Sequence, residues 1–431
     1  MIYDSRGTLV VVEAGEATRV AISLSTGGGF ADAFPDMGPT AHLMPVMPLI
    51  VGGIFRLFGA GSPAALIVLL VGALAQFVAV LLLIDRLYTR LGLPIGARRL
   101  GLAVFCLAPI FAKEEFIDFR FWEGALAVIL NCGGLLEISR VRNGEILSPR
   151  RTIAAGVLAA VTFFVSPPAG IGIVAAWIVT AIPHLRWRQA VLLGGSAALA
   201  LALMVTPWAM RNARVMGTAV LLRDNFGLEL ALGIDPAVGS GRPASVAYER
   251  NYATLHPYRS AAARARLRAG GGEIAYSRML GRRAWIWIAE HPMAFTRLAL
   301  RHYAAFFFPE VWQSGDNHRA DARPLILSLI NLLGFAALLL DALSRRFRLT
   351  PVAVFVLATA LPYALVQPIP RYSYLVYGLM CFATMGLVHQ GVQMASARIA
   401  LRHRRRTAAS DYSLGTGPKS AAPPFRHRSN R

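Results

Sequence analysis

The stretch Ala64-Ala-Leu-Ile-Val-Leu-Leu-Val-Gly-Ala-Leu-Ala-Gln-Phe-Val-Ala-Val-Leu-Leu-Leu83 decides the fold of this chain. It contains no charged side chain, and Gln76 is its single polar one. A helix of about 20 apolar residues covers the roughly 30 Å of hydrocarbon in a bilayer. A helix also satisfies all of its backbone polar groups internally, as lipid requires. The stretch is therefore predicted to be a transmembrane helix.

Similar apolar blocks recur along the whole chain, which is 55% hydrophobic. Soluble domains are about 45–50% apolar, so the excess is expected to face lipid. The predicted apolar segments cover residues 43–58, 64–84, 99–112, 121–138, 152–166, 170–183, 189–207, 325–343, 350–367 and 372–395. The first segment is short and interrupted by Pro45 and Pro48, so we expect it to be re-entrant. The Ser166-Pro167-Pro168 break predicts a tight helical hairpin of residues 152–183.

The predicted fold class is thus an all-α polytopic membrane protein with about nine transmembrane helices and one re-entrant segment. We expect five regions: an external loop with a juxtamembrane helix (1–45), a helical membrane region (46–207), an extracytoplasmic loop region (208–322), C-terminal transmembrane helices (323–397) and a basic, disordered cytoplasmic tail (398–431). The 208–322 region is predicted to be small and mixed α/β.

The net charge of +21 does not indicate nucleic-acid binding. Only Lys113 and Lys419 are lysines among 44 basic residues, and most arginines lie between apolar blocks. That pattern anchors membrane orientation, whereas a nucleic-acid site needs a basic face. Cys106, Cys132 and Cys381 all lie in apolar segments, so neither a disulfide framework nor a zinc site is expected.

Arginines in four short connections and in the C-terminal tail predict the orientation. They are Arg86, Arg90, Arg98 and Arg99; Arg140, Arg142, Arg150 and Arg151; Arg186 and Arg188; Arg345, Arg346 and Arg348; and, in the tail, Arg398, Arg402, Arg404, Arg405 and Arg406. If these are cytoplasmic, then 1–45, 112–120, 166–169, 208–322 and 367–371 are external. Nine crossings then place Met1 outside, although Met1–Gly15 contains no signal peptide. Either an upstream transmembrane helix is missing from this sequence, which is the interpretation we favour, or the chain inserts in an unusual way.

Several stretches, in order along the chain, carry a family resemblance. They are Glu16-Ala-Thr-Arg-Val-Ala-Ile-Ser-Leu24, Gly27-Gly-Gly-Phe30, Gly38-Pro-Thr-Ala41, Pro45 through Gly59, Phe121-Trp-Glu-Gly-Ala-Leu126, Thr206-Pro-Trp-Ala-Met-Arg-Asn212, Leu222-Arg-Asp-Asn-Phe-Gly-Leu-Glu-Leu230, His256-Pro257, Gly272-Glu-Ile-Ala-Tyr276, His291-Pro292 and Pro368-Ile-Pro-Arg-Tyr372. Together they resemble the GT-C superfamily of membrane glycosyltransferases, and especially its bacterial protein O-mannosyltransferase and lipid A aminoarabinose transferase group. Members of that group usually have a transmembrane helix before the first external loop.

The resemblance implies transfer of a sugar from a polyprenyl-phosphate donor to an acceptor at the external face of the bacterial inner membrane. The leaving phosphate needs arginine or another fixed donor. The acceptor hydroxyl needs a carboxylate to orient it or to take its proton. By position in the resembling stretches, the expected catalytic residues are Glu16 and Glu123, with Asp4 and Glu13 as fallbacks for Glu16. The expected substrate-binding residues are Arg211, Arg223, Asn225, Glu229, His256, Glu273, Tyr276, Arg371 and Tyr372.

Each candidate also has a structural interpretation. Glu16 could be a solvated charge on an amphipathic surface helix, and Glu123 could pair with Arg120 or Lys113 at the interface. Arg211 and Arg371 could extend their charged groups to the interface. Asn225 and Glu229 could serve in caps and turns, and Glu273 could be a first-turn acid. Lys113, Glu114 and Glu115 form a loop cluster that we expect to be solvated.

Two other functions remain open on the sequence: a transporter or flippase of lipid-linked substrates, and a catalytically inactive relative in envelope polysaccharide assembly. Transporters place polar groups near the midplane and often contain repeats, whereas the spans here are nearly uncharged and no repeat is visible. No spacing of acids and histidines predicts a metal site, although the resemblance leaves a divalent ion open as a cofactor. The sugar is undetermined, and the acceptor is a lipid, a polysaccharide or a protein.

Overall fold

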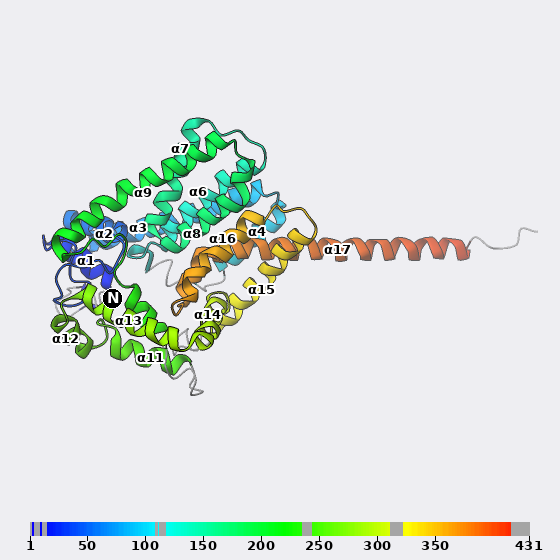
Figure 1. The fold of residues 1–431 in the computed structure, drawn as a ribbon. Coiled ribbons are helices and arrows are strands. Elements are labelled where there is room, and N and C mark those ends of the chain that lie inside the picture. Colours follow the sequence, from blue (N-terminus) through cyan, green and yellow to red (C-terminus); the bar gives the residue numbers. More distant parts are fainter. Residues whose placement is uncertain are drawn as a thin grey trace, which may run out of the picture.

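The computed structural model of the chain describes residues 2–3, 9–10, 15–107, 111, 118–234, 244–310 and 322–414. These residues are almost entirely helical (Figure 1). The helices are α1 (Glu16–Ser25), α2 (Val46–Phe58), α3 (Pro63–Arg90), α4 (Ile95–Leu107), α6 (Gly124–Arg142), α7 (Pro149–Val165), α8 (Pro167–Ala176), α9 (Trp187–Met216), α10 (Phe226–Gly233), α11 (Ala244–Leu255), α12 (Ala261–Ala269), α13 (Glu273–Glu290), α14 (Pro292–Phe307), α15 (Ala322–Leu343), α16 (Thr350–Ala360) and α17 (Tyr374–Leu414). Two short strands, β1 (Ile2–Tyr3) and β2 (Leu9–Val10), pair antiparallel.

Every apolar segment predicted from the sequence corresponds to a helix, and the all-helical polytopic fold class is confirmed. Six helices are long and apolar enough to cross a membrane: Pro63–Arg90, Gly124–Arg142, Pro167–His184, Trp187–Met216, Ala322–Leu343 and Pro370–Arg402. The other three predicted crossings correspond to α4, α7 and α16, which have 13, 17 and 11 residues. With 13 residues, α2 is about 20 Å long, too short to span the hydrocarbon and compatible with a re-entrant segment.

Local sequence signals set the helix boundaries. Ser62 caps the start of α3 and Ser148 caps the start of α7. The Ser62 hydroxyl accepts the Ala65 N–H, and the Ser148 hydroxyl accepts the Arg151 N–H. In both helices a proline occupies the first position. Ser166 is extended and separates α7 from α8 at the predicted Ser-Pro-Pro break. The two helices pack on each other beyond it. Gly217 ends α9 in the left-handed conformation, at φ 70°.

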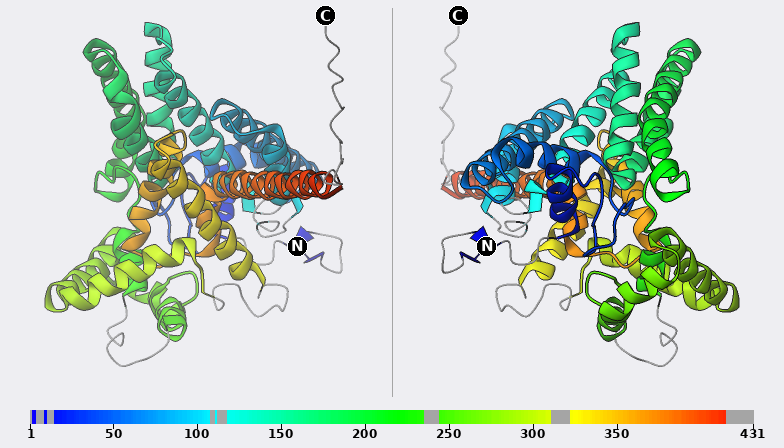
Figure 2. Two further views of the ribbon diagram at one scale, coloured as in Figure 1. Left: turned by 90° about the vertical axis from the view of Figure 1, so that its right-hand side faces the viewer. Right: turned by 90° about the vertical axis from the view of Figure 1, so that its left-hand side faces the viewer.

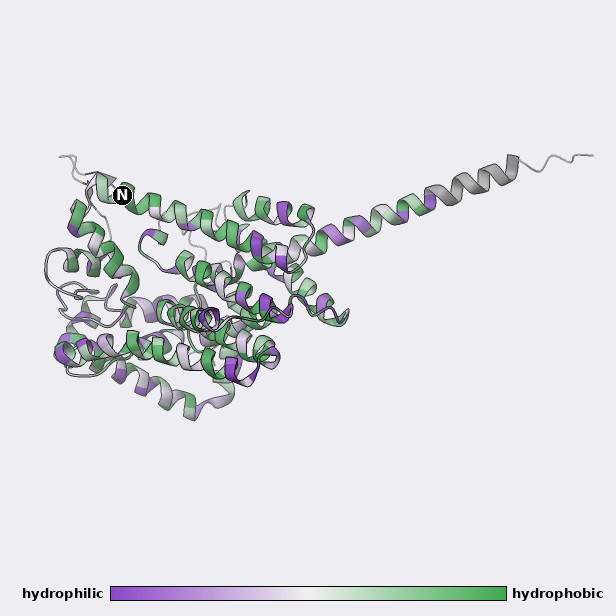
Figure 3. Ribbon diagram, turned by 90° about the horizontal axis from the view of Figure 1, so that it is seen from above, coloured by the Kyte–Doolittle hydropathy of each residue, from purple (hydrophilic) through white to green (hydrophobic). Residues whose placement is uncertain are grey.

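The apolar surfaces are divided between a core and the outside of the bundle. Inside, aromatic side chains of α3, α4 and α17 stack, for example Tyr88 on Phe382 and Phe105 on Tyr377. On the outside of the bundle, only 6% of the most apolar 18-residue stretch of α9 is buried. Residues such as Leu199 and Leu203 are exposed there. A soluble protein would rarely leave so much contiguous apolar surface in water. Figure 3 shows the same apolar character along the long helices.

Four connections lie together at one end of the bundle, here called the arginine-rich end. They join α3 to α4, α6 to α7 and α15 to α16, and the fourth leads into α9. Arg90 pairs with Glu145 at 2.7 Å. Arg142 donates to the Phe347 carbonyl at 2.6 Å, and Gln189 donates to the Leu147 carbonyl at 3.0 Å. These contacts link all four connections, as the orientation argument requires.

The helices α1 and α10 to α13 lie at the other end of the bundle, here called the site end (Figures 1 and 2). The long helices run between the two ends. For instance, α6 begins after Glu123 at the site end and finishes with Arg142 at the arginine-rich end. The chain therefore separates its arginine-rich connections from its candidate functional residues by the length of the bundle.

Two predictions about local structure were wrong. The described residues of 208–322 form helices α10 to α14 rather than a mixed α/β region, because they combine apolar faces with helix starts such as the Ser260 cap and Pro292. The tail predicted to be disordered from residue 398 continues α17 as far as Leu414, since its Ala and Arg residues favour helix. Helix α17 projects well beyond the bundle (Figure 1).

Candidate functional site

Glu16 occupies the first turn of α1 at the site end, and the loop after α1 brings His42 back to it. Gly27, Gly29 and Gly38 adopt positive φ angles, which allow the loop its sharp turns. Asp32 closes the loop on itself, accepting the Gly38 N–H on its side chain at 2.8 Å and donating its own N–H to the Gly38 carbonyl at 2.8 Å.

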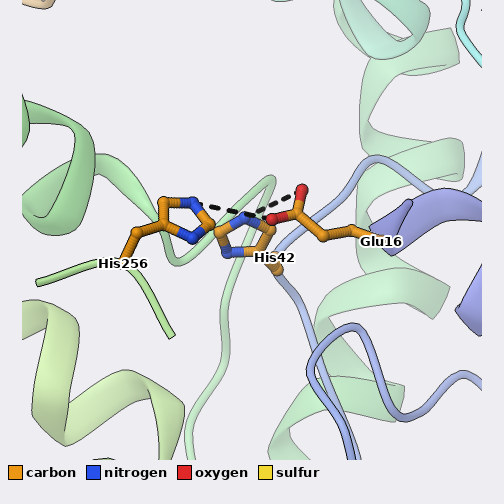
Figure 4. A group of neighbouring side chains, drawn as sticks. All are labelled: Glu16, His42 and His256. Atoms are coloured by element: carbon orange, nitrogen blue, oxygen red, sulfur yellow. Dashed lines mark ion pairs between the residues drawn. The ribbon is translucent and has the colours of Figure 1, made fainter. Parts of the chain in front are cut away.

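The Glu16 carboxylate faces two neighbouring imidazoles (Figure 4). Its Oε2 is 3.6 Å from Nε2 of His42, and its Oε1 is 3.5 Å from Nε2 of His256. The histidine side chains are only 3% and 5% exposed, whereas that of Glu16 is 24% exposed. The carboxylate is therefore held by two buried groups and still reaches the surface, unlike a solvated charge on a surface helix.

The surroundings set the ionisation of these three groups. Burial would raise the pKa of Glu16, but the neighbouring His42 and His256 outweigh it and lower it to about 2. Burial would lower the pKa of His42, yet the adjacent carboxylates raise it to about 9. Burial lowers the pKa of His256 to about 4. Glu16 is thus ionised at neutral pH, and His256 is neutral.

A network of hydrogen bonds fixes the segment Thr40–His42. The Thr40 hydroxyl lies 2.9 and 2.7 Å from the two carboxylate oxygens of Glu273, and the Ala41 N–H donates to the same carboxylate at 3.2 Å. Arg211 donates to the Thr40 carbonyl at 2.7 Å and also to the Phe30 carbonyl. Glu273 and Arg211, both expected to bind substrate, here hold the loop that carries His42.

Asp224 completes the enclosure of this segment. Its N–H donates to the Ala41 carbonyl at 3.2 Å, so the turn before α10 is joined to the loop after α1. Asp224, His42, Glu273 and Tyr276 line a small pocket on one side of this junction. The Tyr276 hydroxyl donates to the Leu255 carbonyl at 2.9 Å, next to His256.

A second group of charged residues borders Glu16 on the side of α6 and α17. Glu123 pairs with Arg223 at 2.8 Å, whereas the structural alternative had been a pair with Arg120 or with Lys113, which lies outside the described residues. The Arg371 guanidinium lies 5.6 Å from the ring centroids of both Trp122 and Tyr372. Its charge also helps to lower the pKa of Glu16.

Glu229 lies within the electrostatic range of this second group. Burial raises its pKa, while nearby His42, Arg223 and Arg371 oppose the increase. The Asn225 amide lies 3.4 Å from a Glu229 carboxylate oxygen, a long contact for a hydrogen bond. Tyr372 stacks on Tyr363 with ring centroids 4.9 Å apart.

The structure therefore brings all eleven predicted site residues into one region of the site end. Three of its central residues were missing from the predicted set: Thr40, His42 and Asp224. Thr40 lies inside the Gly38-to-Ala41 stretch of the resemblance, and Asp224 follows Arg223 in another, so position was the available signal. His42 had none. Asp4, Glu13, Lys113, Glu114 and Glu115 lie outside the described residues.

Two sets of side chains place their potential metal-ligand atoms within 4.8 Å of one another: Glu16, His42 and His256, and His42, Asp224 and Glu273. In the first set, Nδ1 of His256 accepts the Tyr258 backbone N–H at 3.2 Å. A neutral imidazole has one lone pair and one N–H. His256 consequently directs an N–H toward Glu16, so its chemistry favours hydrogen bonding over metal coordination. In the second set, burial and the neighbouring Glu273 carboxylate raise the pKa of Asp224.

Comparison with known proteins gave one structural likeness. No family model matches the chain, and no curated protein sequence matches it. The chain is similar to the archaeal oligosaccharyltransferase AglB from Archaeoglobus fulgidus, solved in complex with an inhibitory peptide and a dolichol-phosphate. The TM-score is 0.48 at 14% identity, and the match covers 90% of this chain. It spans 47% of that protein, about half of its length.

Proposed function

We propose that this chain is a GT-C-type membrane glycosyltransferase that moves a sugar from a polyprenyl-phosphate donor to an acceptor at the external membrane face. The observation that carries the proposal is the Glu16 carboxylate, which is paired with two buried histidines and still partly exposed. The order of the resembling sequence stretches supports the same class.

The separation of the two ends supports an external site. Arginine-rich short connections remain in the cytoplasm, and the candidate residues lie at the opposite end of the helices. With the arginine-rich end inside, the C-terminus is cytoplasmic and Glu16 faces the outside of the inner membrane. A polyprenyl chain stays in the bilayer, so its phosphate and sugar reach this membrane-proximal level.

The reaction forms a bond between the acceptor oxygen and the anomeric carbon and breaks the bond from that carbon to the phosphate oxygen. The bonding electrons leave with polyprenyl phosphate, and the sugar configuration inverts. With a pKa near 2, Glu16 is a weak base but remains a strong hydrogen-bond acceptor. Its role in this scheme is to orient the acceptor hydroxyl and to take its proton late, as the new bond forms.

Arg223 and Arg371 are suited to bind the donor phosphate. The Nε of each is buried and has no hydrogen-bond partner among the described residues. Buried donors of this kind are costly unless a ligand uses them. Glu123 orients Arg223 through their 2.8 Å pair, and Tyr372 flanks Arg371. In this scheme Asn225 and Glu229 contact the sugar, and His256 positions Glu16.

The distribution of buried charge favours surface chemistry over transport. Among the described residues, the buried Arg and Glu side chains are Arg120, before α6, and Glu273, in α13. Neither lies in the middle of a spanning helix. A transporter of the alternating-access type would place such groups near the midplane.

The test is release of free polyprenyl phosphate from a panel of polyprenyl-phosphate sugars, with an acceptor-containing extract, by membranes carrying the protein. Wild type should turn over one donor, and Glu16→Gln should lose roughly 100-fold or more of that rate. Glu249→Gln is the matched control, because Glu249 is an exposed carboxylate on α11 at the same end. Equal rates for wild type and Glu16→Gln would refute the role of Glu16. No turnover of any donor by correctly inserted protein would refute the transferase.

A further inference from the structure

The part of the site end that α11, α12 and α13 form carries an excess of positive charge (Figure 1). Residues 244–290 contain eight arginines and three glutamates, with neither lysine nor aspartate. None of these eight arginines forms an ion pair among the described residues. At the arginine-rich end, by contrast, Arg90, Arg98 and Arg151 each pair with an acid at 2.7 Å. The charge of this external surface is therefore left uncompensated by the described chain.

Four arginines, here called the external arginines, gather around the end of α11. They are Arg259, Arg264, Arg266 and Arg283. Arg264 donates to the Pro257 carbonyl at 2.7 Å, and Arg266 donates to the Thr254 carbonyl at 2.6 Å. Arg283 lies near the same place, because burial raises the pKa of Tyr276 while nearby Arg266 and Arg283 oppose the increase. Residues from α11, α12 and α13 thus concentrate positive charge at one point.

A chain of ring contacts links Arg259 to the proposed catalytic carboxylate. The Arg259 guanidinium lies 5.9 Å from the centroid of the Tyr252 ring. That ring lies 4.6 Å from the His256 ring, and Nε2 of His256 lies 3.5 Å from the Glu16 carboxylate. A ligand held by the external arginines would therefore approach Glu16 along the end of α11.

Two of the external arginines have no structural task that accounts for them. Arg264 and Arg266 satisfy carbonyls at and just after the end of α11, as basic residues often do at a helix C-terminus. Arg259 and Arg283 are exposed, and their side chains donate no hydrogen bond within the described part of the chain. A guanidinium has five N–H groups and binds a carboxylate through two parallel hydrogen bonds. Arg259 and Arg283 are therefore available to an anionic ligand.

The surroundings of these arginines are polar rather than suited to lipid. Val246 is the one exposed large hydrophobic side chain described between residues 246 and 270. Further along the chain, Trp285 and Ile286 of α13 and Met293 of α14 are exposed, as expected nearer the membrane interface. Tyr252, which stacks on Tyr248 beside Arg259, adds the aromatic surface that ligand sites commonly combine with charged groups.

We propose that the external arginines bind a carboxylate-bearing polysaccharide from the aqueous side and present one of its hydroxyl groups to Glu16. Arg259 and Arg283 would each meet a sugar carboxylate through paired N–H···O bonds. An anionic lipid would need an apolar surface that this face lacks, and an acidic peptide offers few hydroxyl groups to Glu16. The role of the polysaccharide as acceptor rests on the glycosyl transfer proposed above, whereas its binding does not.

Equilibrium binding to the full-length protein in nanodiscs of neutral lipid tests the proposal. The probe is oligogalacturonate, which has one carboxylate per sugar, and its neutral methyl ester is the matched control ligand. Wild type should bind the acid at least about 10-fold more tightly than the ester, and added salt should weaken that binding. Equal binding of acid and ester would overturn the proposal. Tighter binding of polyglutamate, or of vesicles containing phosphatidylglycerol, would overturn it in favour of a protein or a lipid.

Variants of the two available arginines locate the surface. The double variant Arg259→Gln, Arg283→Gln should weaken oligogalacturonate binding about 10-fold or more, with an unchanged melting temperature. Arg297→Gln removes an exposed arginine of α14 and should bind as wild type does. A double variant that binds as tightly as wild type would contradict the assignment.

Turnover distinguishes this proposal from the transferase itself. With an oligogalacturonate acceptor and an active donor, the double variant should raise KM for the acceptor about 10-fold and leave kcat within about twofold. If no donor is turned over while oligogalacturonate still binds at the external arginines, the transferase is refuted and the binding surface stands. Turnover that is indifferent to the acid and its ester would instead refute the acidic acceptor and leave the transferase standing.

Discussion

The arginine-rich end and the site end both contain acid–base pairs, and the Arg90–Glu145 pair at the first differs from the group around Glu16 at the second. At the arginine-rich end, Arg90 and Glu145 meet at 2.7 Å while their side chains remain 27% and 43% exposed. At the site end, the imidazoles beside Glu16 are 3% and 5% exposed and stand 3.5–3.6 Å from the carboxylate. The first arrangement is a close pair in water, and the second is a looser group shielded from it.

This difference separates anchoring from chemistry. Exposed ion pairs contribute about 0–1 kcal/mol each, so the Arg90–Glu145 pair adds little to stability. Buried carboxylates and imidazoles lose hydration and stabilise a fold only when they are fully satisfied. Asp224, Arg223 and Arg371 retain buried polar atoms without partners among the described residues. Such atoms also occur at the arginine-rich end, in Arg98, Arg140 and Arg142, so the two ends differ chiefly in the shielded imidazoles beside Glu16.

The first way to test the contrast is to remove one arginine from each end. Arg371→Met should reduce polyprenyl-phosphate release about 100-fold, because it deletes a proposed donor to the leaving phosphate and a cation near Glu16. Arg371→Lys should recover part of the rate. Arg90→Met at the arginine-rich end should change the rate less than about twofold. An Arg371→Met protein as active as wild type would contradict the phosphate assignment.

The second test concerns the loop that carries His42. Thr40→Val removes the hydroxyl that meets both oxygens of the buried Glu273 carboxylate. An unsatisfied buried group costs about 1–3 kcal/mol, so the melting temperature in detergent should fall by several degrees. We expect the turnover rate to fall about 10-fold as His42 loses its fixed position. Thr40→Ser keeps a hydroxyl and should retain most of both properties, and a Thr40→Val protein unchanged in both would refute the role of this network.

The third test uses pH. Burial in α14 lowers the pKa of His302 to about 4, below its ordinary 6.5. The folded state therefore binds this proton less readily than the unfolded state, so the stability is complete above pH 6.5 and decreases as pH falls toward 4. His302→Gln should show a smaller loss of melting temperature between pH 6.5 and 4. His184, which is exposed at the arginine-rich end, provides the control: His184→Gln should keep the wild-type pH profile.

The smallest effect is expected for the exposed pair. The double variant Arg90→Gln, Glu145→Gln should shift the free energy of unfolding by less than about 1 kcal/mol, because both side chains are hydrated in either state. Thermal melts at low and high salt provide the measurement. A large, salt-dependent loss of stability would mean that this end contributes as much to folding as the buried site end.

The sequence was sufficient for the spans because hydrophobicity is a local property. Runs such as 64–84 need no partner to be recognised, and all ten segments are helices in the structure. The orientation argument also relied on local signals, and the arginine-rich connections do lie together. The 208–322 region was misjudged because helical periodicity there is interrupted by many arginines and glycines.

The site was only partly predictable, because its central contacts join residues that are far apart in sequence. Thr40 and Glu273 are separated by 233 positions, and no spacing rule connects them. Position in the resembling stretches indicated Glu16, His256 and Arg371 one at a time. It did not reveal His42, whose importance arises from its place between Glu16 and the Asp224–Glu273 pair. Proximity of that kind exists only after folding.

The most direct measurement compares two Glu→Gln substitutions, one at each end, in the polyprenyl-phosphate release assay at equal protein level. Glu16→Gln should lose at least roughly 100-fold in rate, while Glu145→Gln should stay within about twofold of wild type. Such a result would locate the chemistry at the site end and assign it to Glu16. Equal rates for the two variants would contradict the central claim that the Glu16 carboxylate, paired with His42 and His256, orients and deprotonates the acceptor.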